Sequence, residues 1–345
     1  MALAVDTADF DYELPEERIA QHPLEARDAA RLLVDDGPGR SPAHRNVRDL
    51  PDLLERGDLL VVNTTRVLPA RLPLRRATGG VAEVLLLERV EGVTWEALVR
   101  PSRKLAPGTA LRPSGGGDDL VVVVGADLGE GRRHVELLVE GDELAVLERH
   151  GQMPLPPYIT EPLDDPERYQ TVFSDRPASA AAPTAGLHLT REVLARCEER
   201  GVRRAEVELV VGLGTFRPIE RDRIEDHVMH SEWYRVPEET LDACRWTRAA
   251  GGRVVAVGTT AVRALESAAA TGELEGRTDL FITPGYEFQV VDRLMTNFHL
   301  PRSSLLVMIE AFIGPRWRDL YAAALADDYR FLSFGDAMLL SRTTP

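Results

Sequence analysis

The sequence has 345 residues, 44% of them hydrophobic and 28% charged, as expected of a globular protein with a large core and about two domains. Its formal net charge of −15 argues against indiscriminate nucleic-acid binding and leaves room only for a local basic patch. Apolar runs such as residues 305–309 are too short to span a bilayer, and the first residues lack the basic start of a signal peptide. We therefore expect a cytoplasmic protein without membrane contact, whose two cysteines, Cys197 and Cys244, are buried thiols.

A loop near the N-terminus gathers several polar side chains. It contains His22, Arg27, Asp28 and Arg31 and leads into a short strand at 32–34. So many charges in so few residues indicate either a binding site or a turn held by salt bridges, and the mixed signs favour the turn.

The first strongly apolar segment, residues 58–62, is predicted to be a buried strand, and Asn63 follows it directly. Polar residues after such a strand are where open α/β sheets hold their ligands. Arg66 and Arg71 are the charges available there.

The pattern changes over residues 68–152, where short alternating or β-branched runs are separated by turns rich in glycine and proline. This pattern is typical of a small antiparallel barrel or sandwich. Because α/β patterning flanks it on both sides, we expect an inserted β-barrel domain at 68–152 within an α/β domain formed by 1–67 and 153–345. The insert carries six cations that favour an anionic partner, although a solvated surface would explain them too: Arg71, Arg75, Arg76, Arg100, Arg103 and Lys104.

Strands and helices alternate in the last part of the chain. The predicted strands at 204–211 and 253–257 each run into glycine and threonine, and a helix follows at 261–267. Such junctions favour an α/β fold with a mixed, mostly parallel sheet whose site lies at the carboxyl ends of the strands.

Residues 180–190 combine small side chains, Pro183, Gly186 and His188, and Thr190 is placed to cap a helix that starts at 191. A loop that exposes its backbone and offers a titratable ring indicates a ligand site. An ordinary connection with one exposed histidine is an equally good interpretation of these residues alone.

Several common motifs are absent or weak. Gly212-Leu213-Gly214 lacks the third glycine and the acidic residue of a dinucleotide-binding fingerprint, and the sequence contains neither a phosphate-binding loop nor the nucleophile elbow of a serine hydrolase. The two histidines within 226–232 lack zinc-protease spacing and a nearby cysteine, so we expect no metal. What remains is a set of polar loops, three of which carry histidine, the side chain best matched to proton transfer near neutral pH.

A series of motifs, in order and over almost the whole chain, resembles the S-adenosylmethionine:tRNA ribosyltransferase-isomerase family. They are residues 14–23 (Leu14-Pro15 through Gln21-His22-Pro23), residues 63–72, residues 151–159, Ala182-Pro183-Thr184-Ala185-Gly186-Leu187-His188, residues 212–218, His230-Ser231-Glu232, residues 256–260, residues 296–301 and Phe334-Gly335-Asp336-Ala337-Met338. The resemblance implies an α/β domain with an inserted β-barrel. It also implies that the ribosyl part of S-adenosylmethionine, a co-substrate, is transferred to an aminomethyl-deazaguanine in tRNA and isomerised, with release of adenine and methionine and formation of epoxyqueuosine.

This chemistry needs a base for the acidic methylene beside the sulfonium, a proton for the departing adenine, and a group that binds the methionine carboxylate. For proton transfer the resemblance points to His188, His230, Glu232 and His299. For substrate binding it points to Arg66, Thr184, Gly186, Gly212, Gly214, Thr215, Thr259, Thr260, Arg263 and Asn297. The start of the helix at Gly258-Thr259-Thr260 suits the carboxylate, the six barrel cations suit tRNA, and we expect a monomer.

The chain departs from the family pattern at Val81, Leu189, Val210, Ala261, Gln289 and Glu310. Two of these changes remove an expected lysine and one adds an anion, which weakens phosphate neutralisation. Two alternatives therefore stay open: a relative that uses S-adenosylmethionine on a free small molecule or cleaves it without tRNA, and an RNA-binding protein that has lost catalysis.

Overall fold

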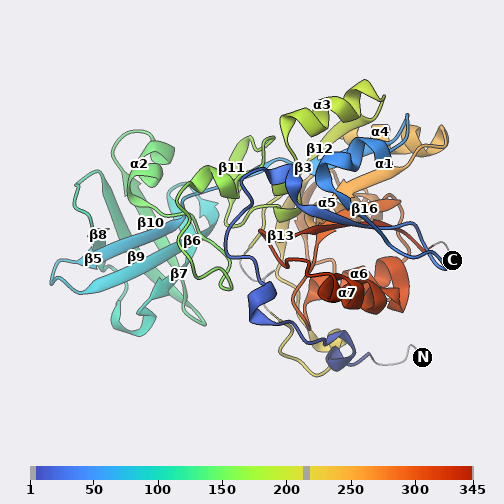
Figure 1. Cartoon of the computed structure of the whole chain (residues 1–345). Helices are drawn as coiled ribbons and strands as arrows, with labels where there is room; N and C mark the ends of the chain where they lie inside the picture. The colour runs from blue at the N-terminus through green and yellow to red at the C-terminus, as the bar shows by residue number, and fades with distance from the viewer. Residues whose placement is uncertain (1–4, 213–217, 344–345) are drawn as a thin grey trace. The chain divides into compact units, whose positions relative to one another are not determined.

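In the computed structural model, which describes residues 5–212 and 218–343, the chain forms two compact units (Figure 1). The α/β unit comprises the chain up to Thr65, Pro157–Asp175 and the chain from Pro183 onward. The barrel unit comprises Arg66–Pro156 and Arg176–Ala182. The domain limits drawn from the sequence, at 67/68 and 152/153, stay a prediction.

The α/β unit is built on a mixed sheet with the strand order β15-β13-β12-β3-β14-β16-β17-β1-β2. The strands are β1 (Arg31–Asp35), β2 (Ala43–Asn46), β3 (Leu59–Asn63), β12 (Arg203–Leu209), β13 (Glu232–Arg235), β14 (Val254–Val257), β15 (Glu275–Thr278), β16 (Arg293–Asn297) and β17 (Ala337–Ser341). The central strands β12, β3, β14 and β16 are mutually parallel, whereas β13 and β17 run antiparallel to their inner neighbours. The predicted mixed α/β sheet is therefore confirmed, with its parallel part at the centre.

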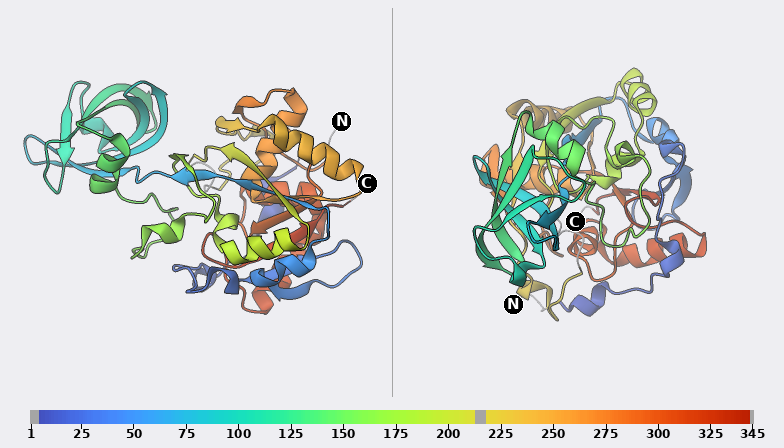
Figure 2. Two further views of the ribbon diagram at one scale, coloured as in Figure 1. Left: turned by 90° about the horizontal axis from the view of Figure 1, so that it is seen from above. Right: turned by 90° about the vertical axis from the view of Figure 1, so that its left-hand side faces the viewer.

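Helices cover both faces of this sheet. They are α1 (Leu50–Leu53), α3 (Arg191–Glu199), α4 (Glu238–Ala249), α5 (Thr259–Thr271), α6 (Ser304–Ile313) and α7 (Trp317–Ala326). Leu60 and Val62 of β3 share a core cluster with residues of α1 and α3, which lie side by side on one face (Figure 2, left). Both faces of β3 and β14 are buried, as expected of central strands in a parallel sheet.

The sequence signals at helix ends and cysteines are confirmed. Thr190 caps α3, because its side chain accepts a hydrogen bond from the backbone N–H of Val193. Cys197 and Cys244 are free and buried. No helix in the described part of the chain is long and apolar enough to cross a membrane.

The barrel unit is a closed antiparallel barrel with the strand order β10-β7-β6-β5-β8-β9. Its strands are β5 (Arg71–Arg76), β6 (Val81–Glu91), β7 (Thr94–Arg100), β8 (Ala110–Pro113), β9 (Leu120–Gly129) and β10 (Arg132–Val139). Helix α2 (Glu143–His150) follows β10, and β4 (Thr65–Val67) pairs with β11 (Arg176–Ser179). Burial alternates along β7 from residue to residue, which places one set of side chains inside the barrel and the other outside.

Candidate functional site

The carboxyl ends of the central strands meet at one edge of the sheet, which we call the carboxyl edge and define by Asn63, Leu209, Val257 and Asn297. Asn63 ties two of these ends together. Its Nδ2 donates to the carbonyl oxygen of Leu209 at 3.0 Å, and its Oδ1 accepts from the backbone N–H of Leu209 at 3.2 Å. The polar residue that ends β3 therefore fixes the geometry of this edge within the protein.

A buried ion pair joins Glu232, at the start of β13, to Arg263 on α5. The side chains of both residues are 4% exposed, and the guanidinium also donates to the carbonyl oxygen of Leu280 at 3.2 Å. The second carboxylate oxygen of Glu232 accepts from the backbone N–H of Gly212 at 2.9 Å. Arg263, expected to bind a substrate anion, is thus directed at a protein carboxylate, and Glu232 anchors the chain where it leaves the carboxyl edge after β12.

The N-terminus of α5 lies at the same edge, directly after β14. Gly258 occupies the cap position with a φ of +89°, and, among the described residues, it leaves the first turn without a side-chain cap. Thr260 is 8% exposed, and its hydroxyl has no hydrogen-bond partner among the described residues. A Cβ on Gly258 would lie 3.6 Å from that hydroxyl, so the hydroxyl faces the helix start. Uncapped N–H groups, a helix dipole and a free hydroxyl together suit an anionic group.

His188 ends η7 (Thr184–His188), the short helical segment formed by the small-residue loop. The side chain of Asn297, at the end of β16, contacts it: Asn297 Nδ2 lies 2.8 Å from His188 Nε2. Asn297 Oδ1 accepts from the hydroxyl of Thr184 at 3.0 Å. The fold therefore connects three residues predicted to belong to the site, although 109 positions separate His188 from Asn297.

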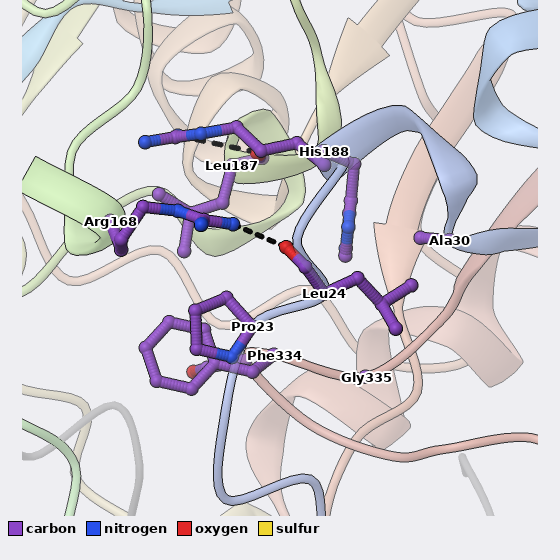
Figure 3. A pocket seen from close by; sticks show the side chains of 10 residues that line it. Pro23, Leu24, Ala30, Arg168, Leu187, His188, Phe334 and Gly335 are labelled. Carbon is purple, nitrogen blue, oxygen red and sulfur yellow. Dashed lines mark hydrogen bonds between the residues drawn. The ribbon is translucent and has the colours of Figure 1, made fainter. Parts of the chain in front are cut away.

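His188 lines a small pocket of the α/β unit (Figure 3). Its other lining residues come from three further segments: Pro23, Leu24, Arg27 and Ala30; Arg168; and Ser333, Phe334 and Gly335, with Leu187 beside the histidine. Burial, and then the positive charges of Arg330 and Arg27, lower the pKa of His188 to about 4. The imidazole is therefore neutral at pH 7.

The N-terminal polar loop fits both of its interpretations. Asp28 pairs with Arg48, and Arg31 pairs with Asp336, as expected of a turn held by salt bridges. Arg27 lines the His188 pocket and donates to the carbonyl oxygen of Glu167 at 2.7 Å. Arg168 and residues 333–335 were not among the predicted site residues, and the only sequence signal for the latter is the motif Phe334-Gly335-Asp336.

Gly186 packs closely against side chains of the α/β unit itself. A Cβ at this position would lie 2.7 Å from Cζ of Phe173 and 3.0 Å from Cγ2 of Thr171. The first contact is shorter than real Cβ atoms show and the second is at the limit, so a side chain here would force Phe173 to move.

The other two candidate histidines have different surroundings. His299 is buried, its Nε2 lies 2.9 Å from the hydroxyl of Thr296, and its backbone N–H donates to Tyr321. Burial lowers the pKa of His299 to about 3. His230 is exposed and lies close to His227.

Among the remaining predicted site residues, Arg66 belongs to the barrel unit, and Gly214 and Thr215 lie outside the described residues. Arg75, Arg100, Arg103 and Lys104 are exposed, whereas Arg71 is half-buried and pairs with Glu83, and the Arg76 guanidinium packs over Gly80. In the ranges 5–212 and 218–343 no group of three or more His, Cys, Asp or Glu could hold a metal ion.

The surroundings of three departures from the family pattern are clear, and two of them have a local explanation. Leu189 is fully buried in the core cluster that contains α1 and α3. The Glu310 carboxylate accepts from the indole N–H of Trp317 and pairs with Arg318, so its negative charge is neutralised within the α/β unit. Val81 is exposed on β6 directly opposite Arg75.

The chain is an α/β protein with an additional small β-barrel. The carboxyl edge of its sheet, with an uncapped helix start and a buried histidine, is the place where proteins of this class bind polar organic ligands. The family described as queuosine biosynthesis protein matches residues 7–340. The chain belongs to this family.

Individual relatives match over almost the full length. The chain is 54% identical over 337 residues to the S-adenosylmethionine:tRNA ribosyltransferase-isomerase of Rubrobacter xylanophilus, with 97% of each chain covered. It is 46% identical to the protein of the same name from Nostoc sp., with 96% of this chain and 91% of that one covered. The crystal structure of S-adenosylmethionine tRNA ribosyltransferase from Thermotoga maritima matches with a TM-score of 0.55 and 39% identity, covering 96% of this chain and 99% of that chain.

Proposed function

We propose that this protein is an S-adenosylmethionine:tRNA ribosyltransferase-isomerase of queuosine biosynthesis. The observation that carries the proposal is the 54% identity over 97% of both chains to a relative with that name. It acts on S-adenosylmethionine as co-substrate and on tRNA that carries the aminomethyl-deazaguanine. We further propose a cytoplasmic monomer that works without a metal.

The N-terminus of α5 is the proposed receptor for the methionine carboxylate of S-adenosylmethionine. Within the described residues its first turn has no side-chain cap, and the hydroxyl of Thr260 has no partner. A carboxylate placed there accepts several charge-assisted hydrogen bonds. Arg263 is left out of this role, because its guanidinium pairs with Glu232.

The exposed cations of the barrel unit are the proposed contacts to tRNA phosphates. Arg100 ends β7, and Arg103 and Lys104 follow within η5 (Ser102–Lys104). Arg75 lies on the outer face of β5, because the alternate residues Leu72 and Leu74 are buried. None of these four cations forms an ion pair with another described residue, so their charges are available to phosphate oxygens.

Of the four candidates for the proton-transfer chemistry, His188, His230, Glu232 and His299, we propose that the first two contact the substrate and the other two hold the site. Their surroundings suggest different contributions. His230 is exposed and therefore free to reach a substrate, whereas Glu232 and His299 are held by Arg263 and Thr296 respectively and would act by positioning the carboxyl edge. Thr184 and Asn297 would position His188 in the same way.

The decisive experiment measures adenine release from S-adenosylmethionine with and without precursor tRNA. Release that requires tRNA, together with formation of epoxyqueuosine in the tRNA, is the expected result. Release without tRNA would indicate a relative that uses or cleaves S-adenosylmethionine by itself. No release in either case, with tRNA binding retained, would indicate an RNA-binding protein and would contradict the proposal.

A further inference from the structure

The orientation of the Asn297 side chain is fixed by two backbone carbonyl groups. Its Nδ2 lies 3.1 Å from the carbonyl oxygen of Leu332 and 3.5 Å from that of Asp336. An amide turned the other way would place Oδ1 against these two oxygens, where no hydrogen is available to either side. The hydroxyl of Thr184, which donates to Oδ1 at 3.0 Å, completes the arrangement.

This orientation determines the protonation of His188. Asn297 Nδ2 has two hydrogens, of which one goes to Leu332 and the other to His188 Nε2, 2.8 Å away. Nε2 must therefore accept, and the proton of the neutral ring must lie on Nδ1. Within the described part of the chain Nδ1 has no hydrogen-bond partner, and the ring lines the pocket of Figure 3, where it points toward Leu24.

Both the hydrogen bond from Asn297 and the nearby positive charges disfavour a second proton on His188. It would sit on Nε2 and face the hydrogens of Asn297 Nδ2. The segments packed around η7 contribute the positive charges of Arg27, Arg168 and Arg330. Two nearby carboxylates do not offset these charges, because Asp336 is paired with Arg31 and Asp28 is paired with Arg48. Glu167 contributes its backbone carbonyl oxygen to Arg27. Both the hydrogen bond and the charges favour the neutral ring.

We propose that Asn297 is a positioning residue that holds His188 as the neutral imidazole protonated on Nδ1, and that His188 serves the reaction as a hydrogen-bond donor and not as a proton acceptor. The second half of this proposal rests on the proposed function. The acceptor is a substrate oxygen or ring nitrogen that gains electron density as the ribosyl group of S-adenosylmethionine rearranges.

The protonation state can be measured without any substrate. Long-range ¹H–¹⁵N spectra of the full-length protein labelled on histidine nitrogens, with His188→Asn used for assignment, should show His188 protonated on Nδ1 and unchanged between pH 6 and pH 8. A ring protonated on Nε2, or one that titrates in this range, would overturn the proposal. Because this readout is independent of activity, it stands even where the proposed function fails.

The variant Asn297→Asp tests whether His188 acts as a hydrogen-bond donor or as a general base. The new carboxylate accepts from Nε2, so the neutral ring loses the proton on Nδ1 and keeps it only as the imidazolium, whose pKa the carboxylate raises. We expect adenine release by this variant, per folded molecule, to increase at least threefold as the pH falls from 8 to 6. Release that increases with pH, as for a histidine base strengthened by a carboxylate, would contradict the proposal.

A pair of His188 variants covers the case in which Asn297→Asp does not fold. The amide of His188→Asn reaches the place of Nδ1 and can donate there, whereas that of His188→Gln reaches the place of Nε2. The asparagine variant should retain at least about tenfold more activity than the glutamine variant, the ratio expected for one hydrogen bond of about 1.4 kcal/mol. Equal losses of activity in both variants, of about 100-fold or more, would indicate that His188 is a general base and would contradict the donor role.

Discussion

The carboxylate of Glu232 and the guanidinium of Arg263 form an ion pair inside the α/β unit, with both side chains 4% exposed. The pair connects the first residue of β13 to the second turn of α5, and Glu232 extends the connection to the backbone of Gly212. Glu232 and Arg263, both predicted from the sequence to act on the substrate, thereby connect three segments at the carboxyl edge: β13, α5 and the chain after β12.

Removal of the cation alone should destabilise the protein strongly. Arg263→Met leaves a buried carboxylate without a counter-charge, and we expect a loss of about 3–5 kcal/mol in the free energy of unfolding. Glu232→Gln combined with Arg263→Met removes both charges and should recover much of that loss. Urea unfolding of the three proteins measures the difference.

The exposed pair Arg245–Asp242 on α4 is the matched control. Arg245→Met should change the stability little, because exposed ion pairs contribute little. A double variant at Glu232 and Arg263 that is as unstable as Arg263→Met would show that charge burial is not the cause.

Gly186→Ala should destabilise the α/β unit by about 1–3 kcal/mol, the usual effect of overpacking a core. The added methyl group meets Cζ of Phe173 at 2.7 Å. Phe173→Leu in the same chain should relieve the clash and restore part of the stability. Thermal unfolding measures both effects, and Gly276→Ala, whose methyl group would lie 4.0 Å from the nearest atom of Tyr234, is the control. Normal stability of Gly186→Ala would contradict the packing explanation and would favour a glycine that allows a ligand to approach.

The stability of the protein should fall as the pH falls from about 6.5 toward 4. The pKa of His299 is lowered to about 3 in the folded protein, against about 6.5 in an unfolded chain. Between these pKa values His299 binds a proton in the unfolded state and does not in the folded state. The free energy of unfolding therefore decreases with decreasing pH by about 1.4 kcal/mol per pH unit. His188, whose folded pKa is about 4, acts in the same direction.

Urea unfolding at pH 7, 6 and 5 tests this dependence. His299→Asn should reduce the slope of the unfolding free energy against pH by about 1.4 kcal/mol per pH unit, the contribution of one proton, whatever its effect on stability at pH 7. Thr296→Val keeps the imidazole and removes its hydrogen-bond partner, so it should lower stability at each pH and retain the slope. An unchanged slope in the His299→Asn variant would rule out this histidine as its source.

The barrel cations should control the salt dependence of tRNA binding. Arg103→Ala combined with Lys104→Ala should weaken binding and make the slope of log K against log salt shallower by up to about 1.8, since each lost phosphate contact accounts for about 0.9. Arg132→Ala, which removes a cation of the same unit that is paired with Glu96, should leave the slope almost unchanged. Equal effects of both variants would place the tRNA interface elsewhere.

The sequence by itself determined the elements and their class. Alternation along β7, the apolar run 59–62 of β3 and the threonine before α3 are local patterns. They reflect the two-residue period of a strand, burial of a strand on both faces, and helix capping, respectively. For that reason the α/β sheet and the antiparallel barrel were both predictable, as was the family resemblance, which depends on motifs read in order.

Only the tertiary structure decided how the polar residues are used. Arg263 pairs with Glu232, His188 is held by Asn297, and Gly186 packs against Phe173. Each of these contacts joins residues that are distant in the sequence, and a buried polar group must find its partner in three dimensions or be destabilising. Residue type shows that a side chain can bind a substrate; the folded neighbours show whether it is free to do so.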